Sequence, residues 1–377
     1  MSKEFPLSCV FVICIFFASC EEGLDPNNND LDTRDSDNNG TGEDVIDSQT
    51  EGPGDGTDRE PDSDTGTKNP EEACGPATVK ELQACVEQKR YVTNLESVAI
   101  LRPPGSDGHR DVQDLLAARL EQLGYEVSRL DYGSGVNIVG RLHGTTEEEV
   151  EVNLSAHYDH IPGCPGADDN ASAVAGALEI ARVLAGIKFE RTLVVAFWDE
   201  EEKGLIGSRH YAKKARKNGA TISIALVLEM IGYIDTAPNT QEVPGGFELL
   251  FPKKVNELKQ NDHRADFIIF VADDSASSIS DSLHNHAEGL GLPSMSLKLS
   301  KRQKSSLLLN SLRRSDHASF WDEDYPAIMI SDTADFRYDA YHCAARMDEI
   351  SLLNHEFSVK VIRATLATLV EELRLGV

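Results

Sequence analysis

Five short segments of this 377-residue chain carry acidic or imidazole side chains of the kind that hold divalent metal ions. Zinc takes imidazole nitrogen and carboxylate oxygen, and two zinc ions about 3.5–4 Å apart need a carboxylate that bridges them. The five segments supply this set of ligands, so the sequence predicts a pair of metals that acidifies water and polarises a carbonyl group. The segments are His157-Tyr158-Asp159, Gly166-Ala167-Asp168-Asp169-Asn170, Asp199-Glu200-Glu201-Glu202-Lys203-Gly204, Leu228-Glu229-Met230 and Tyr341-His342.

Most of these segments follow a hydrophobic run. His157 comes directly after residues 150–156, and Asp199 comes directly after residues 192–198. In an open α/β sheet, ligand sites gather at the carboxyl ends of the strands. We therefore expect the acidic and imidazole side chains to meet at one edge of a sheet.

Extended and helical patterns alternate along residues 76–377, which predicts a three-layer α/β sandwich with a mixed, mostly parallel central sheet flanked by helices. Several extended runs are continuously apolar, as is typical of strands buried on both faces. The predicted strands are 126–132, 136–142, 150–156, 192–198, 222–228, 267–271 and 327–330. The predicted helices are 78–91, 112–123, 172–185, 208–217, 275–290 and 356–373.

Individual side chains favour particular roles in such a site. Alternation along a strand end points His157 and Asp159 to the same side, so Asp159 is placed to orient the imidazole of His157. In the second segment either Asp169 or Asn170 caps the following helix while Asp168 faces the metals.

Four successive carboxylates, at residues 199–202, repel one another. At the end of a buried strand such a cluster needs a cation, whereas a solvated loop is the alternative. The apolar strand before it and Gly204-Leu205-Ile206-Gly207-Ser208 after it favour a tightly folded turn.

The ordered motifs resemble the co-catalytic di-zinc aminopeptidases of metallopeptidase family twenty-eight. The resemblance covers residues from about 78 to 374. Besides the segments above, it includes Ala171-Ser172, Leu205-Ile206-Gly207-Ser208, Ile231-Gly232-Tyr233, Arg314-Ser315-Asp316-His317-Ala318-Ser319-Phe320-Trp321 and Asp332-Thr333-Ala334-Asp335-Phe336-Arg337.

The resemblance implies a role for each matching residue. Asp168 is the implied bridging carboxylate, Glu201 the general base, and Tyr341 the phenol that helps to hold the oxyanion. The peptide bond between Asp168 and Asp169 is expected to be cis, and Asp159 and Asp169 are expected to lie just outside the ligands. The implied metal ligands are His157, Asp168 and Glu229 for one zinc ion, and Asp168, Glu202 and His342 for the other.

The resemblance therefore implies an exopeptidase that hydrolyses N-terminal residues from peptide substrates with two zinc ions per subunit. Glutaminyl cyclases and carboxypeptidases resemble the same family, and a surface lipoprotein that binds metal without turnover is a further alternative. Two positions depart from the family pattern: an aspartate expected four residues after His342 is Arg346, and a glycine expected before Tyr325-Pro326 is Asp324. The preferred N-terminal residue and the oligomeric state do not follow from the sequence.

The N-terminus resembles that of a bacterial lipoprotein. Residues 6–17 are apolar but too short to span a bilayer, and Phe17-Ala18-Ser19-Cys20 resembles a lipobox. We expect residues 1–19 to be a signal peptide and Cys20 to carry the lipid that anchors the protein to a membrane of the cell envelope, facing the periplasm or the exterior, with simple secretion as the alternative.

Residues 20–75 are expected to be a disordered acidic tether, and residues 76–377 the peptidase domain. Residues 21–74 hold 18 acidic and three basic side chains, so more than half of the net charge of −28 lies there. The low pI therefore says little about partners, and no basic, aromatic-laced stretch suggests nucleic acid.

Four cysteines remain after the signal peptide and Cys20. Cys74 and Cys85 are close in sequence and form one plausible bridge. Cys164 precedes Asp168, and Cys343 directly follows His342, so these two pair if both segments meet at the metals. The alternative is that Cys164 and Cys343 are small buried residues.

Overall fold

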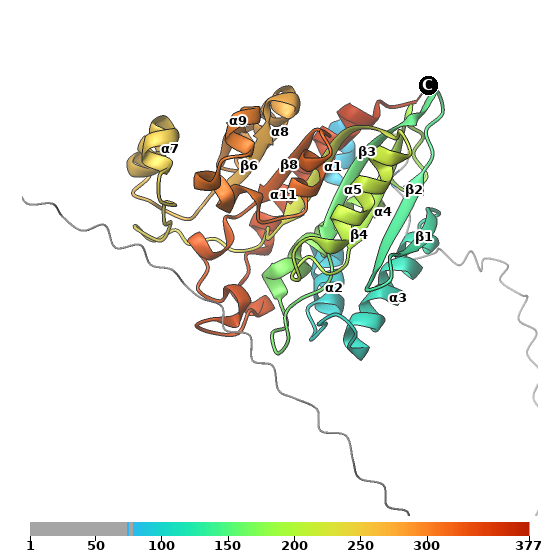
Figure 1. Ribbon diagram of the computed structural model, residues 1–377, viewed down its shortest axis with the longest axis horizontal. Coiled ribbons are helices and arrows are strands. Elements are labelled where there is room, and N and C mark those ends of the chain that lie inside the picture. Colours follow the sequence, from blue (N-terminus) through green and yellow to red (C-terminus); the bar gives the residue numbers. More distant parts are fainter. Residues whose placement is uncertain (1–73, 75–77, 377) are drawn as a thin grey trace, which may run out of the picture. The chain divides into compact units, whose positions relative to one another are not determined.

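The computed structural model of the chain describes residue 74 and residues 78–376 (Figure 1). The predicted signal peptide, Cys20 and most of the acidic tether lie outside this range, so the lipid anchor and the location in the cell envelope stay predictions. Among the helices of the described residues, none has both the length and the apolarity needed to cross a membrane.

The described residues form one mixed sheet, as the sequence predicted, and this sheet has eight strands. The strand order is β1-β2-β4-β3-β5-β8-β6-β7; β3, β4, β5 and β8 are parallel neighbours, and β6 pairs antiparallel with β8. β1 and β2 form an antiparallel hairpin, and β2 joins β4 antiparallel. The strands are β1 (Glu126–Asp131), β2 (Val136–Leu142), β3 (Glu147–His157), β4 (Arg191–Trp198), β5 (Thr221–Glu229), β6 (Ile268–Asp273), β7 (Ser294–Leu299) and β8 (Ala327–Ser331).

Helices cover both faces of this sheet (Figure 1). The α-helices are α1 (Val79–Ala84), α2 (Gln88–Val98), α3 (Asp107–Gln122), α4 (Ala173–Leu184), α5 (Ile206–Lys217), α6 (Phe247–Leu250), α7 (Pro252–Gln260), α8 (Ser277–Gly289), α9 (Lys301–Lys304), α10 (His317–Asp322) and α11 (His355–Leu373). The shorter turns are the π-helix η1 (Ala167–Ser172) and the 3-10 helices η2 (Asp274–Ala276), η3 (Leu307–Arg313), η4 (Ala334–Phe336), η5 (Tyr341–Cys343) and η6 (Ile350–Leu352).

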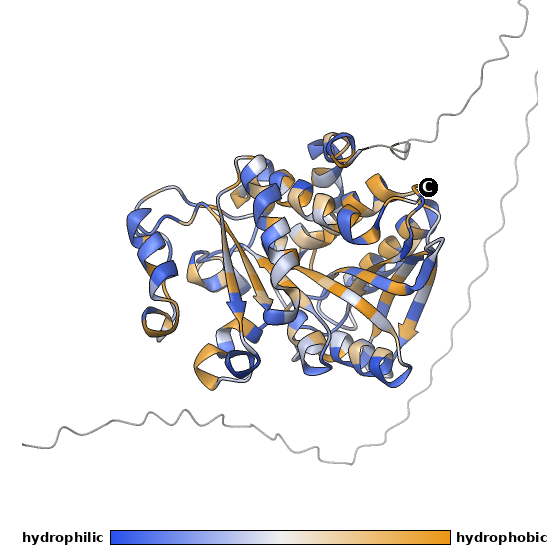
Figure 2. Cartoon of the chain, turned by 90° about the horizontal axis from the view of Figure 1, so that it is seen from above, coloured by the Kyte–Doolittle hydropathy of each residue, from blue (hydrophilic) through white to orange (hydrophobic). Residues whose placement is uncertain are grey.

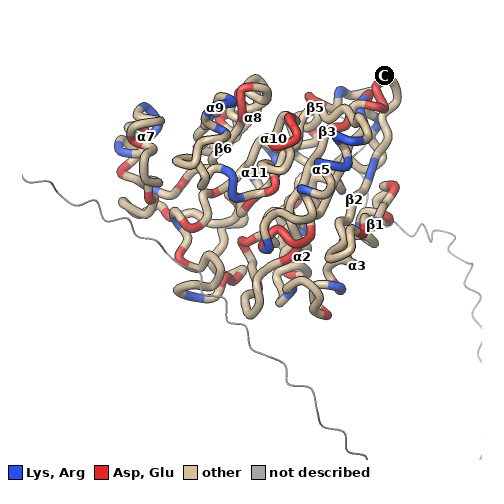
Figure 3. Tube along the Cα trace, viewed as in Figure 1, with Lys and Arg blue, Asp and Glu red and all other residues tan. Residues whose placement is uncertain are grey.

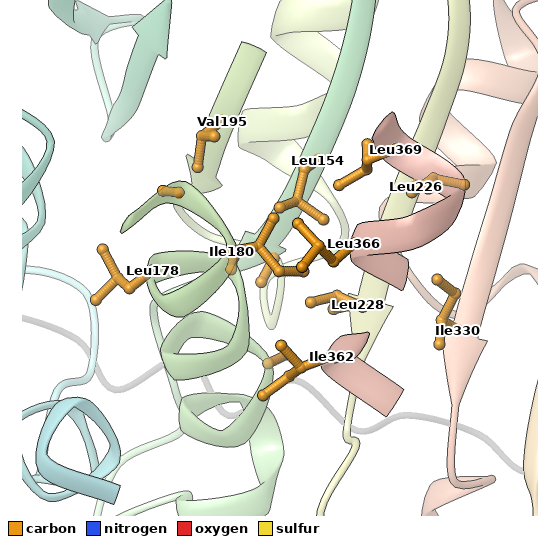
Figure 4. Packing of buried hydrophobic residues seen from close by; sticks show 14 of the residues in the cluster. Leu154, Leu178, Ile180, Val195, Leu226, Leu228, Ile330, Ile362, Leu366 and Leu369 are labelled. Carbon is orange, nitrogen blue, oxygen red and sulfur yellow. The ribbon is translucent and has the colours of Figure 1, made fainter. Parts of the chain in front are cut away.

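Strand β4 shows how the two layers of the core form. Its side chains alternate between faces, so Val195 and Phe197 belong to the core cluster that also holds residues of α1–α4, α8 and α11, whereas Val194 and Ala196 belong to the cluster that also holds residues of α5, α7 and α10. Both sets are fully buried, which explains why the strand is continuously apolar in sequence. Figure 4 shows the first layer, where Ile180 of α4 and Leu366 of α11 meet Leu154 of β3.

Hydropathy follows the layers. The helices carry polar residues on one side and apolar residues on the other, while apolar residues dominate the central strands (Figure 2). Lys and Arg residues are interspersed with Asp and Glu residues along the described chain (Figure 3).

One helix prediction was wrong. Residues 78–91 were expected to form a single helix, but the structure ends α1 at Ala84 and starts α2 at Gln88. Cys85 is bonded to Cys74 at this break, and the N–H of Glu87 donates to Glu179 Oε1 at 2.7 Å. The carboxylate of Glu179, which is distant in sequence, therefore accepts the hydrogen bond that a backbone carbonyl of a continuous helix would accept. The edge strand β7 was also missed, because its alternating pattern is short and polar on one face.

The topology brings the carboxyl ends of the parallel strands to one edge. His157 at the end of β3 is paired with Trp198 at the end of β4, and Glu229 at the end of β5 is paired with Ser331 at the end of β8. The loops that follow these ends carry the acidic and imidazole side chains singled out in the sequence.

Candidate metal centre

Two histidines from distant parts of the chain face a shared aspartate. His157 Nε2 lies 3.3 Å from Asp169 Oδ1, and His342 Nε2 lies 3.3 Å from Asp169 Oδ2. On the first side Glu229 Oε2 is 3.6 Å from His157 Nε2, and on the second Glu202 Oε2 is 3.1 Å from His342 Nε2. The two oxygens of one carboxylate thus divide the site into two halves. The first half contains His157 and Glu229, and the second half contains His342 and Glu202.

The structure contradicts the prediction that Asp168 is the carboxylate between the histidines. Asp168 Oδ1 accepts from the N–H of Gly232 and the hydroxyl of Ser172, both at 2.8 Å, and so points into the core. The expected cis peptide is also displaced by one residue: it joins Asp169 to Asn170. Asp169, which was expected outside the ligands, lies between the two histidines instead.

Asp168 has a different environment from its neighbour. Burial, and then the nearby carboxyls of Asp332 and Asp348, raise the pKa of Asp168 well above its usual range. Asp168 is therefore protonated more readily than an ordinary aspartate. Asp169 shows the opposite behaviour: burial opposes its charge, but His160, His157 and His342 outweigh burial and hold its pKa well below the usual range.

The donor set fits a pair of zinc ions. Ligands about 2.0–2.1 Å from a tetrahedral zinc ion are about 3.4 Å apart. The four nitrogen-to-oxygen distances of 3.1–3.6 Å match this edge, so one cation fits in each half. Nε2 of both His157 and His342 is buried without a hydrogen-bond partner among the described residues, which leaves each lone pair available to a metal.

Asp159 connects the first histidine with the glutamate turn. Its Oδ1 accepts from the N–H of Glu201 at 3.0 Å and its Oδ2 accepts from the N–H of Glu202 at 3.3 Å. The same carboxylate lies 3.5 Å from His157 Nδ1. Asp159 therefore holds the backbone of Glu201 and Glu202 and the ring of His157 in a fixed arrangement, from a position outside the candidate ligands.

Glu201 faces the first half of the site. One carboxylate oxygen of Glu201, one of Glu229 and a ring nitrogen of His157 all lie within 4.8 Å of one another. Burial, together with the like charges of Glu229 and Asp316, outweighs the attraction of His157 and raises the pKa of Glu201 well above its usual range. An acidic group with this tendency to hold a proton is suited to proton transfer.

Tyr341 is half-buried beside the second half of the site. Its ring stacks on the neighbouring imidazole of His342 with centroids 3.9 Å apart. The Tyr341 hydroxyl accepts from Arg314 Nη2 at 3.0 Å, and Arg314 in turn bonds both carboxylate oxygens of Asp335 at 2.9 Å. The phenol is thus fixed, and its own proton is free to point toward a substrate oxygen.

Two residues near the centre were missed in the sequence. His160 is fully buried and its Nδ1 lies 2.8 Å from Glu202 Oε1, so it orients the carboxylate whose other oxygen faces His342. Asp348 accepts from the N–H groups of Asp168 and Asp169 at 2.9–3.0 Å. The spacing His157-x-Asp159-His160 could have drawn attention to His160.

Asp348 also bears on a departure noted in the sequence. The aspartate expected four residues after His342 is Arg346, which pairs with Asp339 at the surface. Asp348, two residues further on, supplies a buried carboxylate instead. The other departure, Asp324, has a φ of 54°, in the left-handed region that favours glycine.

Disulfides join Cys74 to Cys85 and Cys164 to Cys343. The second links the loop after β3 to the residue that follows His342, across 179 positions of sequence. A crosslink of this kind limits how far the His342 segment moves from the shared aspartate.

An apolar cavity of about 90 Å³ opens beside the first half of the site. Glu229 and Tyr341 border both the cavity and the metal centre. Its walls include Val255 of α7, Phe267 just before β6, Ile269 and Val271 of β6, Met295 of β7 and Met329 of β8. Complete ligand sites are typically about 300–1,000 Å³, so this space fits one side chain rather than a whole peptide.

The family model described as "Peptidase family M28" matches residues 137–368, in agreement with the motifs read from the sequence. The chain is 31% identical over 231 residues to the uncharacterised protein YfbL of Escherichia coli K12, a match that covers 57% of this chain and 65% of that protein. It is 37% identical over 82 residues to aminopeptidase YwaD of Bacillus subtilis 168, which covers 22% of this chain and 18% of that protein. The chain thus spans less than two thirds of each of these two relatives.

The fold is shared with a solved aminopeptidase. The structure of LapA aminopeptidase from Legionella pneumophila superposes with a TM-score of 0.60 at 17% sequence identity, over 79% of this chain and 74% of that one. This likeness confirms the predicted α/β sandwich.

Proposed function

This chain belongs to peptidase family M28, and from that premise we propose that it is an aminopeptidase that binds two zinc ions per subunit. The observation that carries the proposal is the position of Asp169, whose two carboxylate oxygens each face a different histidine at 3.3 Å. His157, Asp169 and Glu229 would hold one ion, and His342, Asp169 and Glu202 the other.

Two zinc ions at these positions would polarise a substrate carbonyl group and make water acidic enough to attack near neutral pH. Glu201 would accept the proton that this water loses, because its carboxylate faces the first half of the site and is not one of the two glutamates nearest the histidines' Nε2 atoms. The same carboxyl group would then deliver the proton to the leaving amine, as a general base that becomes a general acid.

Tyr341 would hold the carbonyl oxygen as negative charge develops on it. Its hydroxyl already accepts a hydrogen bond from Arg314, so its own proton is available for donation. Donors fixed before the reaction contribute most to this kind of stabilisation. Burial and the nearby carboxylate of Asp169 raise the pKa of Tyr341, so the phenol stays protonated.

The carboxylates where the cavity meets the metal centre support cleavage from the N-terminus. Glu229 lies at the boundary between the cavity and the centre, and Glu201 lies near it, so a protonated N-terminal amine meets negative charge there. A free C-terminal carboxylate would be repelled at the same place. We therefore propose that the N-terminal residue places its side chain in the apolar cavity and its amine beside Glu229.

A substrate screen tests this proposal. With the full chain, we expect hydrolysis of leucine and phenylalanine amides, no hydrolysis of N-acetylated equivalents, and two zinc ions per chain by elemental analysis. Removal of metal with a chelator should abolish activity, and added zinc should restore it. Release of ammonia from a glutamine-initiated peptide, with a pyroglutamyl residue left at the N-terminus of the intact peptide, would instead identify a cyclase, and cleavage of blocked peptides from the C-terminus would identify a carboxypeptidase.

The cavity makes a prediction of its own. Replacing Ile269 by Phe fills part of the space, so kcat/KM for leucine amide should fall by about 10-fold or more, since a misfit of one or two methylenes costs about 1–3 kcal/mol. Alanine amide, whose methyl group needs less room, should change by less than about threefold and serves as the control within the same protein. An equal loss for both amides would place the substrate side chain elsewhere.

A further inference from the structure

Arg102 is buried completely, close to the metal centre, although it lies outside the residues that the family model matches. It belongs to the loop between α2 and α3. A buried guanidinium is costly to desolvate, and burial lowers the pKa of Arg102 to about 10, which still leaves it charged at neutral pH. A charged group placed in the core at this cost calls for an explanation.

All five hydrogen bonds of the guanidinium go to backbone carbonyl oxygens. Nε donates to Tyr158 at 2.8 Å, and Nη2 donates to Gly166 at 2.9 Å and to Asp169 at 3.2 Å. Nη1 donates to Pro165 and, at 3.2 Å, to Ile100. The guanidinium therefore joins the start of the loop that connects β3 to η1, at Tyr158, to the end of the same loop and to η1 itself.

The two ends of this loop carry opposite sides of the first half of the site. The carbonyl of Tyr158 belongs to the residue between His157 and Asp159, and the carbonyl of Asp169 belongs to the shared aspartate itself. The backbone of Arg102 adds a further link, because its carbonyl accepts from the N–H of His160 at 3.4 Å. Displacing the guanidinium would leave buried carbonyls without donors and would free the two ends of the loop from each other.

The charge of Arg102 has a second effect. The carboxylates that interact with it most are those of Asp169, Asp159, Asp348 and Glu202. A fixed cation among them reduces their mutual repulsion before metal arrives, although none of these side chains is its hydrogen-bond acceptor.

We propose that Arg102 is a positioning residue of the metal centre: its fork holds the Tyr158 and Asp169 carbonyls, and so sets the distance between His157 and the shared aspartate. This role rests on the proposed zinc-binding function. Arg102 lies in the N-terminal helical region and is distant in sequence from every candidate ligand. Its part in metal affinity therefore could not be recognised from the sequence.

The test replaces Arg102 by Lys, which keeps the charge but offers no planar fork, and by Gln, which removes the charge. Arg182→Lys is the matched control, because Arg182 is also a buried guanidinium and bonds Glu179 and the carbonyl of Cys85 away from the centre. Zinc affinity of the full chain is measured by equilibrium competition with a chelator, alongside thermal unfolding of the metal-free chain.

We expect zinc to bind about 10–100-fold more weakly to both Arg102 variants, the usual effect of losing a residue that orients ligands. The control should stay within about threefold of the parent, even if its metal-free chain is destabilised as much. At saturating zinc, the Arg102→Lys variant should lose kcat more than it changes KM.

Parental zinc affinity in a folded Arg102→Lys or Arg102→Gln variant would overturn the positioning role. If neither variant folds with zinc present while Arg182→Lys does, Arg102 serves folding instead, which also overturns it. Failure of the parent chain itself to bind zinc would refute the proposed function and is distinguished by that first measurement.

Discussion

Replacing Glu201 by Gln is expected to lower kcat by about 10²–10⁴-fold while both zinc ions remain bound. Gln has nearly the same shape, so the N–H bond from residue 201 to Asp159 Oδ1 would persist and the turn would keep its place. What is lost is the ability to take and return a proton. The two halves are defined by Glu229, 3.6 Å from His157, and by Glu202, 3.1 Å from His342. Because Glu201 belongs to neither pair, zinc binding should not depend on it.

Steady-state kinetics with leucine amide and zinc analysis of the same preparation would measure both parts of this expectation. Glu200→Gln is the matched control. Glu200 is the adjacent buried glutamate, but its carboxylate bonds Ser134 and Lys203 rather than facing the histidines. A Glu201→Gln protein with parental turnover would remove Glu201 from the mechanism, and a loss of zinc with activity would make it a ligand instead.

The fold was predictable because most of the apolar runs in the sequence coincide with buried strands of the sheet. The continuous run of residues 192–198 became β4, buried on both faces, and the run before His157 became the parallel strand beside it. The predictions failed where tertiary contacts override local pattern. The helix predicted across residues 78–91 is interrupted at Cys85, and no local feature reports the distant Glu179 carboxylate that receives the N–H of Glu87.

The site was predictable to the level of segments but not of single residues. Strand ends place His157 and Glu229 at one edge, and both follow from periodicity. Which of two adjacent aspartates faces outward depends on the backbone of the η1 turn. That turn is held by Asp348, about 180 residues away, and by the Arg102 fork. Neither contact has a signature in sequence.

The exchange of roles between Asp168 and Asp169 leads to the second large effect. The Asp169→Asn variant should bind zinc more than about 100-fold more weakly than the parent, and hydrolysis should fall with the affinity. This loss is larger than the one caused by replacing a residue that only orients ligands. A neutral amide keeps one acceptor oxygen but has no second one to offer, so the two halves would no longer share a carboxylate.

Asp168→Asn is the matched control, one residue away and equally buried. Its amide oxygen would still accept from the N–H of Gly232 and the Ser172 hydroxyl, and its NH₂ group would carry no charge near the carboxyls of Asp332 and Asp348, which raise the pKa of Asp168. We therefore expect zinc content and kcat within about fivefold of the parent. If Asp168→Asn lost the metal and Asp169→Asn kept it, the bridging position would return to Asp168. Because the two substitutions make the same chemical change at neighbouring buried carboxylates, a difference between them reports which side chain faces the histidines and not a general loss of stability.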